Sequence, residues 1–173
     1  KDGRRVFDRF RGRAMFPIRD ERGRVIAFGG RLNDPEAKAQ KYMNSPETPL
    51  FHKGRVLYGL DMAKNAMRSE DAALLVEGYM DVIALHQAGF DSAVASLGTS
   101  LTEEQARIIA RHTDRIVISY DADGAGQAAA QRAIDILKKC DLQVKVLRIP
   151  GAKDPDEVIK ARGADAFRNL IER

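Results

Sequence analysis

The sequence predicts an α/β fold, in which a mainly parallel sheet is flanked by helices and follows a basic segment with an antiparallel hairpin. From about Leu60, short apolar runs alternate with longer helical patterns, which is typical of βα units in a parallel sheet. Before that point, "MFPIRDERGRVIAFGGR" (15–31) places two apolar runs around a charged turn that ends at Gly23. The charge distribution changes at the same point, because residues 1–60 are basic and carry 14 Lys/Arg against 7 Asp/Glu.

The next stretch, "LNDPEAKAQKYMNSPETPLFHKG" (32–54), contains three prolines and shows no convincing period. We expect it to be an ordered loop, because so long a structureless linker is unusual inside a compact domain. The chain therefore divides into a basic N-terminal part (1–59), an α/β domain (60–150), and an acidic loop with helices that complete this domain (151–173).

The α/β part should contain six helices and four strands. Helices are expected at 61–70, 81–89, 102–112, 124–140, 154–163 and 164–173, and strands at 72–78, 91–96, 115–121 and 143–150. Thr102 followed by Gln105 predicts a capping box at the start of the third helix.

The composition is that of a globular protein, with 44% hydrophobic and 31% charged residues. No apolar stretch approaches the roughly 20 residues that cross a bilayer, so we expect a soluble, cytoplasmic chain without membrane partners. A single cysteine, Cys140, excludes an internal disulfide and suits a reducing compartment. Because position 1 is Lys and not Met, we expect a fragment or a processed chain.

Acidic side chains gather where three predicted strands give way to helices. They are Glu77 and Asp81, then Asp121 and Asp123, then Asp154, Asp156 and Glu157. If the strands are parallel, all three junctions open on one edge of the sheet, where α/β proteins bind ligands. The sequence therefore predicts an acidic cluster at that edge.

Such a cluster requires compensation, because like charges about 4 Å apart repel by about 1 kcal/mol even in water. Carboxylate oxygens without His or Cys partners favour Mg²⁺ or Mn²⁺, which keep positions for water or phosphate. Gly124 and Gly126 fit this interpretation, since they let the amides of a helix start approach a phosphate.

Three other interpretations of these acids were weighed. Any one pair could simply cap a helix, although three coinciding junctions favour a site. A calcium loop that begins at Asp121 fails, because Arg132 stands at its twelfth position, where Glu is needed. An aspartyl nucleophile of a phosphatase stays possible but leaves Glu77 unexplained.

The pattern of a glutamate after one strand and Asp-x-Asp after a later one resembles the TOPRIM domain of primases, topoisomerases, some nucleases and recombination mediators. The sequence segments around these acids identify the family more specifically. "RAMFPIRDERGRVIAFGGR", "KYMNSPETPLFHKGRVLYGL", "VEGYMDVIALHQAGF", "ASLGTSLTEEQ" and "SYDADGAGQAA" together resemble the RNA polymerase core of bacterial DNA primases over essentially the whole chain.

This resemblance implies a nucleotidyltransferase of the DNA-directed RNA polymerase type, which makes short RNA primers from nucleoside triphosphates on single-stranded DNA with Mg²⁺ or Mn²⁺. It places Glu77, Asp121 and Asp123 on the principal catalytic and metal positions, and Asp81, Asp154 and Asp156 on further metal positions. It places Arg11, Lys41, Asn44 and Lys53 on positions that contact nucleotide or template. It also implies a replicative helicase as partner, through a domain that this chain lacks.

Two alternatives stay open at this point. A TOPRIM-type metal-dependent nuclease would use the same acids, whereas a non-catalytic nucleic-acid-binding module would show salt-sensitive DNA binding without turnover. In the basic segment 1–13, Phe7 and Phe10 alternate with arginines and could stack on bases. We favour their packing into the core, with phosphate contacts left to Arg11, Lys41 and Lys53.

Overall fold

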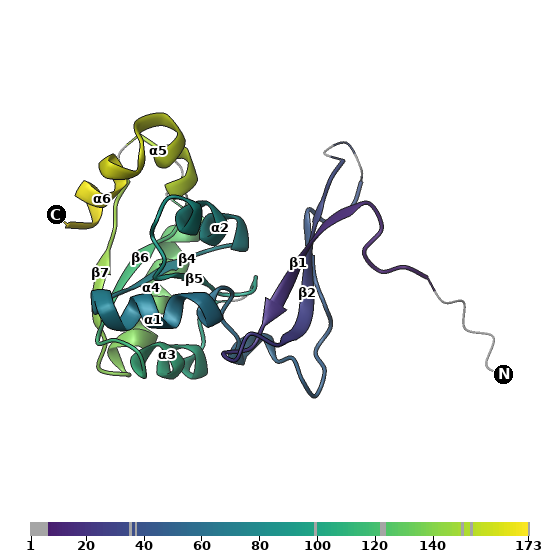
Figure 1. Ribbon diagram of the computed structural model, residues 1–173, viewed down its shortest axis with the longest axis horizontal. Coiled ribbons are helices and arrows are strands. Elements are labelled where there is room, and N and C mark those ends of the chain that lie inside the picture. The colour runs from purple at the N-terminus through teal and green to yellow at the C-terminus, as the bar shows by residue number, and fades with distance from the viewer. Residues whose placement is uncertain are drawn as a thin grey trace.

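The computed structural model describes residues 7–34, 36, 38–98, 100–121, 124–149, 151–152 and 154–172. A small antiparallel sheet stands beside an α/β body (Figure 1). The small sheet contains β1 (Arg13–Arg19), β2 (Val25–Leu32) and β3 (Tyr42–Asn44), in that order.

The predicted hairpin is confirmed, and its turn has a clear local cause. One carboxylate oxygen of Asp20 accepts hydrogen bonds from the amides of Arg22 and Arg24, both at 3.0 Å. Gly23 has a φ of 81°, a value that glycine adopts without strain. The turn therefore sets the register in which Pro17 faces Phe28.

The prediction for 32–54 was incomplete, because this stretch adds a strand and a short helix. Tyr42–Asn44 pairs antiparallel with Gly29–Arg31, and Lys53–Arg55 forms the 3₁₀ turn η1. A three-residue strand is too short to show the alternation by which strands are recognised in a sequence.

The α/β body confirms the predicted parallel sheet. Its strands run in the order β5-β4-β6-β7, and every neighbouring pair is parallel. The strands are β4 (Ala73–Val76), β5 (Ala93–Ala95), β6 (Arg115–Ser119) and β7 (Gln143–Val146). The helices are α1 (Leu60–Glu70), α2 (Tyr79–Gln87), α3 (Glu103–Ala110), α4 (Gly124–Lys138), α5 (Pro155–Arg162) and α6 (Ala164–Glu172).

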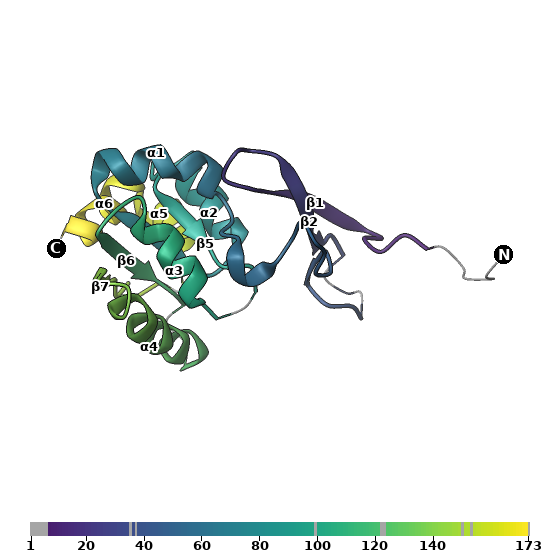
Figure 2. The ribbon, with the colours of Figure 1, turned by 90° about the horizontal axis from the view of Figure 1, so that it is seen from below.

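Helices cover both faces of this sheet, and alternate residues of β4 show the division. Leu74 and Val76 belong to one buried cluster, which also contains apolar residues of α2, α5 and α6. Ala73 and Leu75 belong to a second cluster, with residues of α1, α3 and α4. Figure 2 looks onto the face that α1, α3 and α4 cover, with α5 and α6 behind the sheet.

The strand order creates a switch point between β4 and β6. The chain leaves β4 for β5 on one side of it, whereas it leaves β6 for β7 on the other side. The helices that follow these two strands, α2 and α4, therefore lie on opposite faces of the sheet. A crevice at the carboxyl ends of such strands is where open α/β sheets bind ligands.

Several contacts join the N-terminal part of the chain to the body. Tyr58, which comes just before α1, exchanges backbone hydrogen bonds of 2.8 and 3.2 Å with Ala95 of the edge strand β5. Glu21, in the hairpin turn, accepts from Arg111 at 3.1 Å and lies 3.2 Å from the ring nitrogen of His112. In the part of the chain that the structure describes, no helix has the length and apolar character needed to span a membrane.

Candidate nucleotide and metal site

Glu77 and Asp121 meet at the switch point. Glu77 directly follows β4, and Asp121 comes two residues after β6. The Glu77 carboxylate accepts a hydrogen bond from the backbone amide of Asp121 at 2.9 Å. A Cβ on Gly126, in the first turn of α4, would lie 2.2 Å from the Asp121 carbonyl oxygen and 2.9 Å from Oε1 of Glu77. Only glycine lets this helix start approach the two acids so closely.

Asp81 joins the same group from the first turn of α2. Its carboxylate accepts from the Gly78 amide at 3.1 Å and so caps this helix. Burial raises the pKa of Asp81 to about 6, with further contributions from the charges of Asp154, Asp121 and Glu77. These four acids line one pocket, so the three strand junctions converge, as the parallel order predicted.

The third junction contributes Asp154 to the pocket that these acids line. Asp154 also caps α5, since its carboxylate accepts from the Glu157 amide at 2.9 Å. Asp156 points elsewhere and forms an ion pair with Lys160 at 2.6 Å. Neither Asp156 nor Glu157 lines the pocket, and Asp123 lies outside the described residues. The metal roles of Asp123 and Asp156 stay predictions.

The pocket has a volume of about 560 Å³, and basic as well as acidic side chains line it; its basic residues Arg9, Lys41 and Lys53 are called the basic wall below. Arg9, Lys41, Asn44 and Lys53 line it together with Glu77, Asp81, Asp121 and Asp154. Asn44 is fixed by a hydrogen bond from its side-chain amide to the carbonyl of Leu97 at 3.1 Å. Arg11 is exposed and does not line the pocket, so its contact with nucleotide or template stays a prediction.

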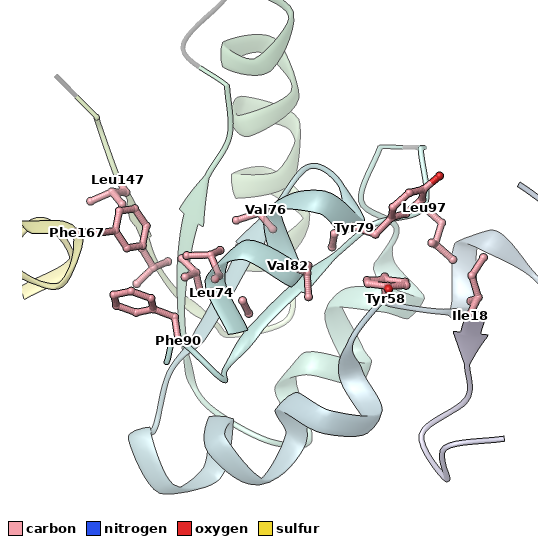
Figure 3. Close-up of a cluster of buried hydrophobic side chains, with 14 of the residues drawn as sticks. Ile18, Tyr58, Leu74, Val76, Tyr79, Val82, Phe90, Leu97, Leu147 and Phe167 are labelled. Carbon is pink, nitrogen blue, oxygen red and sulfur yellow. The ribbon is translucent and has the colours of Figure 1, made fainter. Parts of the chain in front are cut away.

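A group of aromatic rings lies at the pocket, and two of them, Tyr42 and Tyr79, line it. The ring of Tyr79 lies 4.9 Å from that of Phe16 and 5.4 Å from those of Tyr42 and Tyr58, measured between centroids. Figure 3 shows Tyr79 and Tyr58 between Val82 and Ile18, where the body meets the small sheet. Desolvation raises the pKa of Tyr79 to about 12, which keeps its hydroxyl neutral. These rings connect the small sheet to α2, the helix whose first turn contains Asp81.

Arg9 and Tyr42 are among the lining residues that the sequence analysis missed. Arg9 was counted only as part of a basic segment, and Tyr42 only as part of a loop. The ammonium of Lys41 lies 5.6 Å from the centre of the Tyr42 ring, which is 38% exposed. Recognition of β3 would have found Tyr42, because it shares a strand face with Asn44 and alternate residues of a strand point the same way.

The preference for packed phenylalanines was right for Phe10 and wrong for Phe7. The Phe10 ring covers Gly30, where an added Cβ would lie 2.7 Å from a ring carbon. Phe7 is 79% exposed. Lone aromatics in a basic segment do not reveal which of them faces a neighbouring strand.

The donor set fits a hard divalent cation. The acids that line the pocket offer carboxylate oxygens, and no His or Cys lies among the lining residues. Within the described ranges, no three His, Cys, Asp or Glu side chains form a ready-made metal group, and Asp123 falls outside those ranges.

The fold and the site together define a Toprim-like domain preceded by a basic N-terminal domain of the primase type. The Toprim-like family matches residues 74–159, and the N-terminal domain of the DNA primase catalytic core matches residues 1–64. Toprim domains generally bind metal ions. The chain belongs to the family of bacterial DNA primases.

Three similar proteins illustrate this relationship. The DNA primase of Clostridium acetobutylicum is 51% identical over 168 residues, which are 96% of this chain and 28% of that protein. The zinc-binding and RNA polymerase domains of Aquifex aeolicus primase superpose with a TM-score of 0.93 at 42% identity, over 99% of this chain and 42% of that one. A DnaG primase catalytic domain bound to ssDNA gives 0.86 at 46% identity, over 95% and 52%. This chain thus spans 28% of the length of its Clostridium relative.

Proposed function

We propose that this chain carries the nucleotidyl-transfer site of a DNA primase, which makes short RNA primers on single-stranded DNA during DNA replication. The observation that supports this most is one pocket that is lined both by carboxylates and by cationic side chains. Phosphoryl transfer depends on positioning and on neutralising phosphate charge, and this pocket provides groups for both. The nucleic-acid partner is proposed from the DnaG neighbour that is bound to ssDNA.

The carboxylates have the first task. Glu77, Asp121 and Asp123 would hold Mg²⁺ or Mn²⁺, assisted by Asp81, Asp154 and Asp156. A bound cation would neutralise charge on the phosphate oxygens and so make the phosphorus atom more susceptible to attack. Glu77 is already oriented by the Asp121 amide, so its second oxygen keeps a defined direction.

The basic wall has the second task. Lys41, Lys53 and Arg9 would bind the phosphates of the nucleoside triphosphate or of the template, and Asn44 would add a polar contact. The exposed face of the Tyr42 ring is suited to stack on a base. We extend the same phosphate-binding role to Arg11, next to the pocket in sequence.

The cellular setting follows from the proposed activity. Template, triphosphates and RNA product place the chain at the replication fork in the bacterial cytoplasm. The replicative helicase is proposed as a partner of the full-length protein, through a region other than the residues described.

The test is incorporation of labelled nucleoside triphosphates on single-stranded DNA with Mn²⁺, by this chain and by Asp121→Asn. We expect product from the first and a loss of about two orders of magnitude or more in the variant, because a charge at the reacting centre is removed. Equal product from both proteins would contradict the assignment. Metal-dependent cleavage of labelled DNA would instead support a nuclease, and DNA binding without any turnover would support a binding module.

A further inference from the structure

The backbone of Lys53 is held from two sides. On one side, the Lys53 amide donates to Oε1 of Glu47 at 2.9 Å, while the other oxygen of Glu47 lies 3.0 Å from the His52 ring nitrogen. On the other side, the side-chain amide of Gln105 donates to the Lys53 carbonyl at 2.9 Å and to the Val56 carbonyl at 2.8 Å. The hydrogen bond from Lys53 holds the pKa of Glu47 below its usual value, so Glu47 is charged at neutral pH.

Gln105 is fully buried, and its remaining polar atom is also bonded. Its side-chain oxygen accepts from the Thr102 amide at 3.1 Å, which forms the predicted capping box of α3. The Thr102 hydroxyl donates to the Gly54 carbonyl at 2.6 Å. A Cβ on Gly54 would lie only 3.3 Å from the Thr102 methyl group, so the turn rests closely against the helix start.

These contacts separate the two tasks of Gln105. Capping α3 needs only the side-chain oxygen, and Glu serves equally well at that place in a capping box. The two donated hydrogen bonds go to a segment about 50 residues earlier in the chain, and only an amide supplies them. The need for Gln and not Glu at position 105 therefore comes from the hydrogen bonds to the carbonyls of Lys53 and Val56, and not from the capping of the helix.

We propose that Gln105 and Glu47 are positioning residues that fix the Lys53 peptide, so that its ammonium points into the pocket toward bound phosphate. This rests on the proposed function, because it requires Lys53 to contact a phosphate. The side chain of Lys53 lines the pocket, while Gln105 and Glu47 do not. They act on the ligand only through the backbone of Lys53.

The experiment is a double-mutant cycle in which calorimetric titration measures the binding of ATP, in Mg²⁺, to the whole chain and its variants. Lys53→Ala should weaken binding by about two- to fivefold, the range of one partly solvated charge contact. Gln105→Met, which is similar in size but cannot donate, should weaken it by a similar factor. The double variant should bind no worse than Lys53→Ala alone, because both changes remove the same contact.

Two further proteins separate positioning from loss of stability. Glu47→Ala releases the Lys53 amide at an exposed site, so it tests the same idea if Gln105→Met does not fold. Thr113→Val removes a buried hydroxyl that donates to Asp71 at 3.2 Å, at the opposite end of the sheet. It should lower the melting temperature and leave ATP affinity unchanged.

Each outcome decides between the two proposals. Additive effects, or full affinity in both Gln105→Met and Glu47→Ala, would overturn the positioning role while Lys53 keeps its phosphate contact. If Lys53→Ala itself binds ATP normally, the proposed contact is wrong and the inference falls with it.

Discussion

Replacing Gly126 by alanine should damage the site from within α4. The new Cβ would lie 2.2 Å from the backbone oxygen of Asp121, a distance that forces the helix start or the strand end to move. Overpacking against backbone costs about 1–3 kcal/mol, while alanine gains at most about 1 kcal/mol over glycine in a helix. We therefore expect a net loss of about 1–2 kcal/mol in the free energy of unfolding.

Gly124 provides the matched control, because it starts the same helix and a Cβ there meets no described atom within 4 Å. Gly124→Ala should be neutral or slightly stabilising. Thermal unfolding should show Gly126→Ala roughly 2–8 °C below the parent protein, given about 2–4 °C per kcal/mol for a chain of this size. Calorimetric titration should also show Mn²⁺ affinity reduced roughly tenfold or more, because a group that orients Glu77 has moved. Equal stability and equal Mn²⁺ affinity of the two variants would refute this reasoning.

Three further outcomes are expected. The pKa of Asp81 is raised to about 6, so between about pH 4 and 6 the folded protein binds more protons than the unfolded chain. The metal-free protein should therefore lose about 1–3 kcal/mol in its free energy of unfolding as pH rises through that range. Denaturant unfolding at several pH values measures this slope, which Asp81→Asn should flatten. Lys41→Ala should reduce the salt dependence of single-stranded DNA binding by about one unit of slope, measured by fluorescence anisotropy. Tyr79→Phe removes a buried hydroxyl that has no hydrogen-bond partner among the described residues, and should change the unfolding free energy by less than about 1 kcal/mol.

Each of these has a result that would contradict it. An unchanged pH slope in Asp81→Asn would assign the proton uptake to another acid. For the salt effect, Lys139→Ala is the control, because Lys139 is exposed just beyond the far end of α4. An equal change of slope in both lysine variants would indicate a general charge effect. A large loss of stability in Tyr79→Phe would mean that its hydroxyl has a partner.

The parallel sheet and its acidic edge were predictable, because βα units repeat with a clear change of period. Once strands are parallel, their carboxyl ends share an edge, so Glu77, Asp81, Asp121 and Asp154 had to approach one another. The capping box at Thr102 and Gln105 was equally clear, since it depends only on local spacing.

The basic wall was harder to predict, because it depends on tertiary contacts with weak local signals. The strand Tyr42–Asn44 is too short to show an alternation of apolar and polar residues, so it was not predicted. This strand places the Asn44 side chain within hydrogen-bond distance of the Leu97 carbonyl. Arg9 and Arg11 look alike in the sequence, and only the packing of Phe10 on Gly30 separates them. The anchoring of Lys53 by Gln105 joins residues far apart in the chain, which spacing alone cannot reveal.

The measurement that tests the central claim most directly is a calorimetric titration with Mn²⁺ and then ATP, on this chain and on the variant Asp121→Ala plus Asp123→Ala. The claim is that the acids hold a cation and the basic wall holds the triphosphate in one pocket. It predicts that the parent chain binds Mn²⁺ and then binds ATP more tightly, and that the variant loses both effects. ATP binding of equal strength in both proteins, with and without Mn²⁺, would contradict it.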